Sequence, residues 1–196
     1  MNKSELLCIE SPKSKQLVTD DLLYIFVTKF NDEAVTKFYE QFLKMTANPD
    51  TKIIPIVISS FGGEVHSLLP MIDIIKASKK PVATVALGKA MSCGAFLLAA
   101  GTKGYRFAAP NADIMIHEVT SFSWDKSTNM QNDAKHTKYL NDLLFKFLGD
   151  WSKKKDPKFY LKMIKEKTNV DLYLTATECK KLNLIDHVGI PNLIKK

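Results

Sequence analysis

The strongest constraint on the fold of this chain is the alternation of short apolar runs with segments of helical periodicity. The run Leu22–Val27 is rich in aromatic and branched residues and predicts a buried strand, and Ile53–Ser60 predicts a second. Between them, apolar side chains recur at helical spacing after Asn31, a residue that often caps helices. Two buried strands joined by a helix predict a crossover connection, which makes the strands parallel.

The same alternation continues along the rest of the chain. Further strands are expected at 79–88, 104–109, 112–119 and 185–190, and further helices at 65–78, 92–100, 129–153, 157–167 and 175–182. This pattern predicts a single α/β domain, residues 1–196, with a mainly parallel sheet covered by helices. The polar residues 1–20, which include Pro12, are expected to form a mobile N-terminal arm.

Charge and cysteine content narrow the class of protein further. The net charge is +7, but lysine supplies nearly all of the positive charge, and the only arginine is Arg106. The lysines are spread along helical segments, which is typical of solvated helix faces, so no nucleic-acid partner is expected. Three widely spaced cysteines form neither a disulfide framework nor a zinc pattern, and no metal or cofactor is expected. Because no apolar run is long enough for a membrane span or a signal sequence, we expect a cytoplasmic protein without membrane contact.

Two turns that follow predicted strands carry residue types suited to chemistry. The stretch "SSFGGE" places Gly62 and Gly63 directly after a buried strand, where their backbone N–H groups could approach a ligand closely. A tight strand-to-helix connection explains the same two glycines equally well. The stretch "AMSCG" resembles a nucleophile elbow, with small neighbours on both sides of Ser92. Two alternatives remain at that turn: Ser92 as the N-cap of the following helix, or Cys93 as a thiol nucleophile.

A serine nucleophile needs a base, and a histidine base is oriented by a carboxylate. His117 ends the apolar stretch "IMIH", and the ends of parallel strands are where α/β proteins place their sites. It could equally be a partly buried histidine that only ends a strand. The other histidines, which look exposed or structural, are His66, His136 and His187. Periodicity does not choose among the candidate acids Asp113, Asp125, Asp171 and Asp186.

Longer motifs carry a resemblance to a known family. The stretches "SSFGGEV", "GKAMSCGAFLLAAGTKGYRFAAPNADIMIHE" and "DLYLTATECKKLNLIDHV" together resemble the ClpP family of self-compartmentalising serine peptidases, from about Ile53 to Val188. The glycine pair, the serine and the histidine occur in the family's order and spacing. The resemblance implies a crotonase-like fold of stacked ββα units with a protruding helical handle, here at about 120–153.

The resemblance also implies roles for individual residues. Ser92 matches the nucleophile, His117 the general base and Asp171 the triad acid, and the backbone N–H groups of Gly63 and Cys93 match the oxyanion hole. Substrate would lie against Gly62, Val119 and Ser121. The implied activity is ATP-dependent endopeptidase cleavage of unfolded polypeptides or peptides. The implied assembly is a homo-oligomer, as one heptameric ring or two, and a possible partner is an AAA+ unfoldase.

The sequence departs from the family pattern at several positions. Phe61 replaces the proline that usually precedes the two glycines, and Met91 replaces a small residue before the serine. Val170 and Leu172 flank Asp171 where family members usually carry the arginines of an inter-ring ion-pair network. The handle segment is not glycine-rich, and the N-terminal stretch does not clearly match the family's axial loop.

Other functions are therefore kept as alternatives. One is a non-catalytic ring subunit or scaffold, which the changed neighbours of Asp171 favour. Another is a crotonase-type acyl-CoA enzyme, which would use a similar oxyanion hole but would leave Ser92 and His117 without a role. A serine–lysine peptidase of the SppA type would need a lysine base, and Lys89 is close to Ser92 in sequence but has no other feature that favours this role.

Overall fold

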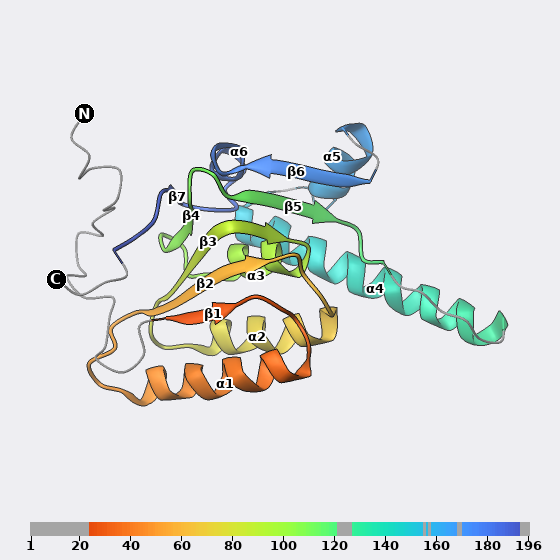
Figure 1. The fold of residues 1–196 in the computed structure, drawn as a ribbon. Coiled ribbons are helices and arrows are strands. Elements are labelled where there is room, and N and C mark those ends of the chain that lie inside the picture. Colours follow the sequence, from red (N-terminus) through yellow and green to blue (C-terminus); the bar gives the residue numbers. More distant parts are fainter. Residues whose placement is uncertain (1–23, 121–126, 155, 157, 168–169, 193–196) are drawn as a thin grey trace.

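Three parallel strands form the centre of the structure. Strands β1 (Ile25–Val27), β2 (Ile54–Ser60) and β3 (Val82–Met91) pair in that order, and helices α1 (Asp32–Ala47) and α2 (Val65–Ala77) connect them. Both helices lie on the same side of the sheet (Figure 1). The predicted crossover connections and the mixed α/β fold are therefore confirmed.

The computed structural model describes residues 24–120, 127–154, 156, 158–167 and 170–192. The expected arm at 1–20, the first two residues of the expected strand 22–27 and Ser121 lie outside these residues. The remaining elements are α3 (Cys93–Ala100), β4 (Arg106–Ala108), β5 (Asp113–His117), α4 (Ser127–Ser152), α5 (Phe159–Lys167), β6 (Asp171–Thr175), α6 (Ala176–Lys181) and β7 (His187–Val188).

Strand β3 is longer than predicted, and this correction matters for the site. The sequence pattern ended the strand at Gly88, but β3 continues to Met91. Gly88 has φ +74°, and the pairing with β2 shifts register around it. Residues 84–86 of β3 pair with β4, whereas residues 89–91 pair with β5, both in parallel. Because the glycine allows the strand to bend and change partners, its last residues run alongside β5.

Strand β6 was not predicted at all. It pairs antiparallel with β5, which makes it the exception in an otherwise parallel sheet. Its sequence "DLYLT" alternates between outward and inward side chains, with Leu172 and Leu174 buried and Tyr173 exposed. Five residues of alternation are a weak signal beside a predicted helix, and the pairing with β5 supplies the rest of the stabilisation.

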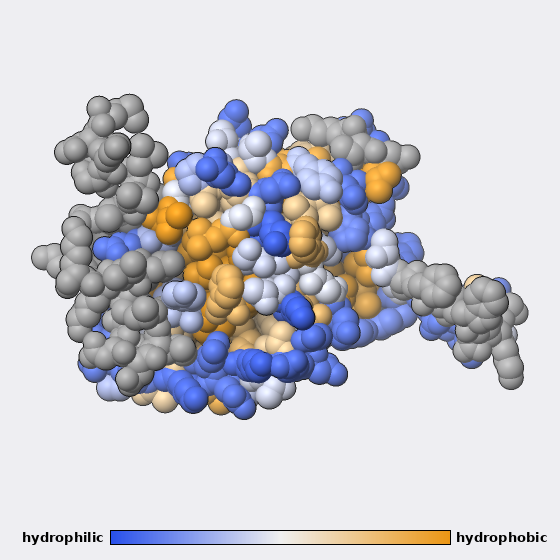
Figure 2. Space-filling model, viewed as in Figure 1, coloured by the Kyte–Doolittle hydropathy of each residue, from blue (hydrophilic) through white to orange (hydrophobic). Residues whose placement is uncertain are grey.

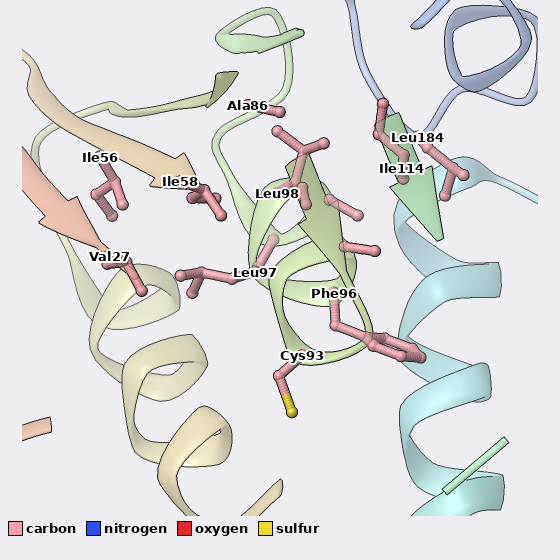
Figure 3. Packing of buried hydrophobic residues seen from close by; sticks show 14 of the residues in the cluster. Val27, Ile56, Ile58, Ala86, Cys93, Phe96, Leu97, Leu98, Ile114 and Leu184 are labelled. Atoms are coloured by element: carbon pink, nitrogen blue, oxygen red, sulfur yellow. The ribbon is translucent and has the colours of Figure 1, made fainter. Parts of the chain in front are cut away.

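Helix α3 lies at the centre of the hydrophobic core. All eight of its residues are buried, as expected for the short apolar helix of the sequence. Figure 3 shows Leu97 pointing towards the side of β1 and β2, while Phe96 points towards α4. Phe96 meets Phe145 of α4 edge-to-face at 5.8 Å between ring centroids. Surrounded in this way, α3 anchors the turn that precedes it.

Helix α4 extends well beyond the sheet, and its N-terminal half projects from the body (Figure 1). Its C-terminal half is held in the core by Leu144, Phe145 and Leu148, whereas most residues from 128 to 139 are exposed. The helix falls in the region expected for a handle. None of the helices in the described part of the chain is long and apolar enough to cross a membrane.

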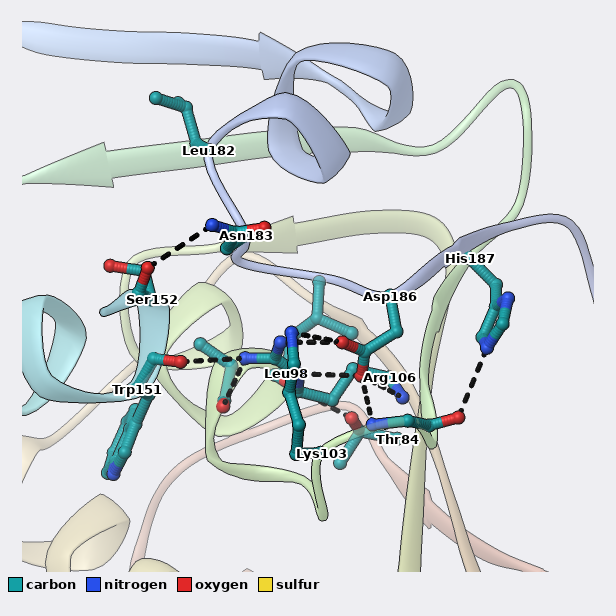
Figure 4. Close-up of polar contacts among 12 residues, drawn as sticks. Thr84, Leu98, Lys103, Arg106, Trp151, Ser152, Leu182, Asn183, Asp186 and His187 are labelled. Atoms are coloured by element: carbon teal, nitrogen blue, oxygen red, sulfur yellow. Dashed lines mark hydrogen bonds and ion pairs between the residues drawn. The ribbon is translucent and has the colours of Figure 1, made fainter. Parts of the chain in front are cut away.

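A buried ion pair ties the end of the chain to the sheet. Arg106 is only 1% exposed and donates to both carboxylate oxygens of Asp186, at 2.9 and 2.8 Å. Its other contacts include the carbonyl of Trp151 in α4, and Lys103 also pairs with Asp186 (Figure 4). Burial raises the pKa of Asp186, but its hydrogen bonds with Arg106 and Lys103 outweigh burial and hold the pKa far below its usual value.

The lysines lie mainly on solvated surfaces. The outer side of α1, along the lower edge of Figure 2, is mostly hydrophilic. There Lys37 pairs with Glu33 one turn earlier, with both side chains exposed. This agrees with the interpretation of the lysines as solvating helix faces.

Candidate active site

Ser92 lies on a sharp turn between β3 and α3. Its backbone has φ +51° and ψ −122°, a strained combination for a residue other than glycine. Its N–H donates to the carbonyl of Met115 in β5 at 2.8 Å. Ser92 stands at the N-cap position of α3, but its side chain makes no capping hydrogen bond to the helix. Strain at an element junction is characteristic of a nucleophile elbow.

The side chain of Ser92 is paired with His117. The Oγ atom of Ser92 lies 2.8 Å from Nε2 of His117, within hydrogen-bonding distance. His117 is the last residue of β5, and the register Met91↔Met115 places it beside the end of β3. The extension of β3 beyond Gly88 is therefore what brings the serine to the histidine.

Asp171 stands on the other side of His117. The two residues are direct partners across the antiparallel β5–β6 pair. Oδ1 of Asp171 lies 3.9 Å from Nδ1 of His117, close enough for electrostatic attraction but too far for a hydrogen bond. The imidazole is 24% exposed and the carboxylate 35%. The structure thus places His117 between Ser92 and Asp171. The contact of His117 with Asp171 is longer than its contact with Ser92.

The other candidate acids lie elsewhere. Asp113 is at the opposite end of β5, where it pairs with Thr175. Asp186 is occupied by Arg106, and Asp125 falls outside the described residues. Among the candidates that the structure describes, Asp171 is the one beside His117.

The remaining histidines have other partners. His66 and His136 are exposed and stack on each other at 5.7 Å between ring centroids. His187 stacks on Phe107, and its Nε2 lies 3.1 Å from the carbonyl of Gly104. These positions agree with the expected exposed or structural roles.

The two glycines of the "SSFGGE" turn lie against Ser92. Gly62 has φ +111°, and a Cβ atom there would sit 2.7 Å from Cβ of Ser92. Gly63 has φ +151°, and a Cβ atom there would sit 2.4 Å from the carbonyl oxygen of Phe30. Neither the Gly63 N–H nor the Cys93 N–H donates a hydrogen bond to another described residue. Both groups therefore remain able to bind an oxygen atom near Ser92.

Cys93 does not have the properties of a reactive thiolate. Its side chain is 2% exposed, and burial raises the pKa of its thiol to about 11. Sγ donates to the carbonyl of Gly63 at 3.2 Å. A protonated, buried thiol directed at a carbonyl is a poor nucleophile, which leaves Ser92 as the candidate at this turn.

The chain segment after His117 is attached to the long helix α4. The N–H of Val119 donates to Oδ1 of Asn141 at 3.0 Å, and Nδ2 of Asn141 donates to Glu118 at 3.3 Å. Asn141 is 7% exposed and was not singled out from the sequence. The available signal was a polar residue within the apolar stripe of a helix, between Leu140 and Leu144.

Among the described residues, no three histidine, cysteine, aspartate or glutamate side chains converge as metal ligands would. The groups available for chemistry are the Ser92–His117 pair and two backbone N–H groups that have no acceptor among the described residues. An α/β fold that places a serine on a strained strand-to-helix turn beside a histidine is characteristic of serine hydrolases.

Comparison with known protein families identifies the family to which the chain belongs. The model of the family described as Clp protease matches residues 13–192. The chain belongs to the Clp protease family, and its mixed α/β architecture, with a parallel sheet and six helices in the described residues, is that of the ClpP fold. The resemblance seen in the sequence is confirmed.

Proposed function

We propose that this protein is a serine endopeptidase of the Clp type that hydrolyses unfolded polypeptides or peptides. The observation that carries the proposal is the 2.8 Å contact between Ser92 Oγ and His117 Nε2 in a chain of the Clp protease family. Ser92 is the nucleophile, His117 the general base, and Asp171 the acid that orients the imidazole.

The geometry supports the following sequence of steps. Nε2 of His117 takes the proton of Ser92 while Oγ attacks the carbonyl carbon of the substrate. The N–H groups of Gly63 and Cys93 stabilise the oxyanion of the tetrahedral intermediate. His117 then protonates the leaving amine, and the same groups activate water to release the acyl product. This scheme requires the proton of neutral His117 to reside on Nδ1, facing Asp171.

The substrate is proposed to lie between the Gly62 turn and the chain that follows His117, including Val119 and Ser121. The N–H of Val119 is bound to Asn141, so pairing with a substrate strand at this residue uses its carbonyl or requires Asn141 to move. In this proposal the protein is a single domain that forms heptameric rings in the cytoplasm, with α4 as the handle. A partner AAA+ unfoldase would hydrolyse ATP and deliver substrate.

A second candidate function is a non-catalytic ring subunit. The observation that favours it is the 3.9 Å separation between His117 and Asp171, together with Val170 and Leu172 at the positions of the family's arginines. An acyl-CoA enzyme would leave the Ser92–His117 contact unused. Turnover of a small fluorogenic peptide by the purified protein distinguishes the peptidase from the scaffold.

The decisive test is labelling with a fluorophosphonate probe, followed by mapping of the adduct by mass spectrometry. We expect one adduct on Ser92 in the wild type and none in Ser92→Ala. His117→Ala should abolish labelling and peptide turnover while the circular dichroism spectrum stays unchanged. His66→Ala is the matched control, because this exposed histidine follows the same glycine turn and should leave turnover intact. An assembled wild type that is neither labelled nor active would refute the proposed function.

A further inference from the structure

The two proposed oxyanion donors come from different parts of the chain. The Gly63 N–H belongs to the turn after β2, and the Cys93 N–H to the first turn of α3. No single element fixes the spacing between them. An oxyanion hole works only when both donors lie about 2.7–3.1 Å from the same oxygen position, so the two turns must be held together.

The backbone of the Gly62–Gly63 turn is not restricted to one conformation by its own residues. Gly62 and Gly63 both have positive φ, and neither carries a side chain that would restrict rotation of the peptide planes. The Gly63 N–H belongs to the peptide before this residue and the Gly63 carbonyl to the peptide after it, so rotation of either peptide would redirect the N–H group. Polar contacts outside the turn must therefore hold its peptide groups in place.

Three residues make contacts of this kind, and one of them, Ser60, makes two, because its Oγ also donates to the carbonyl of Gly62 at 3.4 Å. The Gly62 N–H donates to Oγ of Ser60 at 3.1 Å, and the Glu64 N–H donates to the carbonyl of Phe30 at 2.9 Å. The third is the Cys93 thiol, which donates to the carbonyl of Gly63 at 3.2 Å. The first two contacts attach the turn to β2 and to the segment after β1. Of the three, the thiol contact joins the turn to α3 and hence to the second donor.

We propose that the side chain of Cys93 is a positioning residue, whose thiol ties the Gly63 carbonyl to α3 and thereby sets the spacing of the two oxyanion donors. This inference rests on the proposed function. The contact is made by a side chain that burial keeps in place, with Cys93 2% exposed. Because burial raises the pKa of the thiol to about 11, Sγ keeps its proton at neutral pH and remains a donor.

Removal of the Cys93 thiol should weaken binding of the transition state and leave binding of the substrate nearly unchanged. Removal of an oxyanion donor outright costs about a hundred- to a thousand-fold in kcat, so loosening one should cost about ten- to a hundred-fold. KM should change by less than about three-fold, because the ground-state carbonyl depends little on the oxyanion hole.

The test compares Cys93→Ala, which removes the donor, with Cys93→Ser, which replaces it by a hydroxyl donor. We expect Cys93→Ala to lose kcat as stated and to bind a peptide boronate, which forms a tetrahedral adduct with the serine, more weakly by a similar factor. Cys93→Ser should recover most of the loss in both measurements. Cys179→Ala is the matched control, since Cys179 is also fully buried but lies in α6, which follows the end of β6 opposite Asp171.

The outcomes separate this inference from the proposed function. Fluorophosphonate labelling of wild-type Ser92 is measured first, and a wild type without label overturns the function and the inference together. If Ser92 is labelled but Cys93→Ala keeps the wild-type kcat, the inference alone is overturned. Equal losses in Cys93→Ala and Cys179→Ala, or no recovery in Cys93→Ser, would also overturn it, because packing would then explain the effect.

Discussion

His117 and Asp171 face each other directly across the β5–β6 pair, yet Nδ1 of the histidine and Oδ1 of the aspartate lie 3.9 Å apart. The backbone register brings the two residues together, and the side chains stop short of a hydrogen bond. On the other side of the same imidazole, the contact with Ser92 is fully formed at 2.8 Å. The site therefore contains a Ser92–His117 pair at hydrogen-bonding distance, and the carboxylate of Asp171 lies near the imidazole without a hydrogen bond to it.

We predict that Asp171→Asn lowers kcat for a small peptide by at least about a hundred-fold. Loss of the aspartate in Ser-His-Asp enzymes typically costs about 10⁴-fold, since the histidine loses its orientation and the stabilisation of its charged form. Asp113→Asn is the control, because Asp113 is exposed at the end of β5 opposite His117. Steady-state kinetics of both variants measure the two values of kcat. An Asp171→Asn enzyme with half of the wild-type rate would show that Ser92 and His117 act as a dyad.

The space beside Ser92 requires glycine at position 62. A Cβ atom there would lie 2.7 Å from Cβ of Ser92, and φ is +111°. We expect Gly62→Ala to remove at least about 99% of peptidase activity, because displacement of a nucleophile by as little as 1 Å can cost a hundred-fold in rate.

Gly104→Ala is the control for Gly62→Ala. Gly104 also has positive φ, +91°, but a Cβ atom there meets nothing within 4 Å. This variant should lose about 1–2 kcal/mol of stability from backbone strain while its activity is retained. Denaturant unfolding and peptide turnover are measured on both variants. If Gly62→Ala kept the activity of Gly104→Ala, the contact with Ser92 would not be what requires glycine at position 62.

The buried ion pair of Arg106 and Asp186 should dominate the stability of the C-terminal part. Asp186→Asn leaves a buried guanidinium without its counter-charge, and we expect a loss of about 3–5 kcal/mol in the free energy of unfolding. Asp156→Asn is the comparison, because Asp156 pairs with Lys162 on the surface and should change the unfolding midpoint little.

The same ion pair predicts an acid-dependent loss of stability. Because the pKa of Asp186 is depressed in the folded state, its contribution is present above the unfolded-state pKa of about 3.9. The contribution is lost as the pH falls from that value through the folded-state pKa. Guanidinium unfolding of the wild type at successive pH values should show a decline below about pH 4 that is smaller in Asp186→Asn. Parallel curves for the two proteins would contradict the assignment.

We predict that the amine of Lys76 is acetylated faster than the amine of Lys37. Burial, and then the nearby charge of Arg106, lower its pKa to about 8, and its Nζ donates to the carbonyl of Ala100 at 2.7 Å. At pH 8 about half of Lys76 is the neutral amine, against less than about 1% of an ordinary lysine with a pKa of about 10.4. The pKa of Lys37 is instead raised, by its hydrogen bond and charge interaction with Glu33.

Acetic anhydride at limiting concentration and pH 8 should therefore modify Lys76 ahead of Lys37. Peptide mass spectrometry over time measures the two rates. The preference should narrow as the pH is raised further, because the neutral fraction of Lys37 then increases while Lys76 is already largely neutral. Equal modification at pH 8 would show that the amine of Lys76 is as well solvated as that of Lys37.

Much of the fold and part of the candidate site could be predicted from the sequence. The apolar runs and helical periodicities determined the α/β class, since these patterns act over a few neighbouring residues. The motifs around Gly63, Ser92 and His117 pointed to the turns on which the site is built. The choice of Asp171 among four aspartates needed the family resemblance, because an acid distant in sequence leaves no periodic signal.

The tertiary structure decided what depends on pairing between distant segments. The continuation of β3 past Gly88 is stabilised by β5, and β6 exists because β5 offers it an edge, so neither was visible in local propensity. The tie between the Cys93 thiol and Gly63 likewise joins residues thirty positions apart. The sequence by itself indicated that Gly63 follows one buried strand and that His117 ends another. The folded sheet determined the 2.8 Å and 3.9 Å contacts, because such distances follow from strand register and side-chain packing.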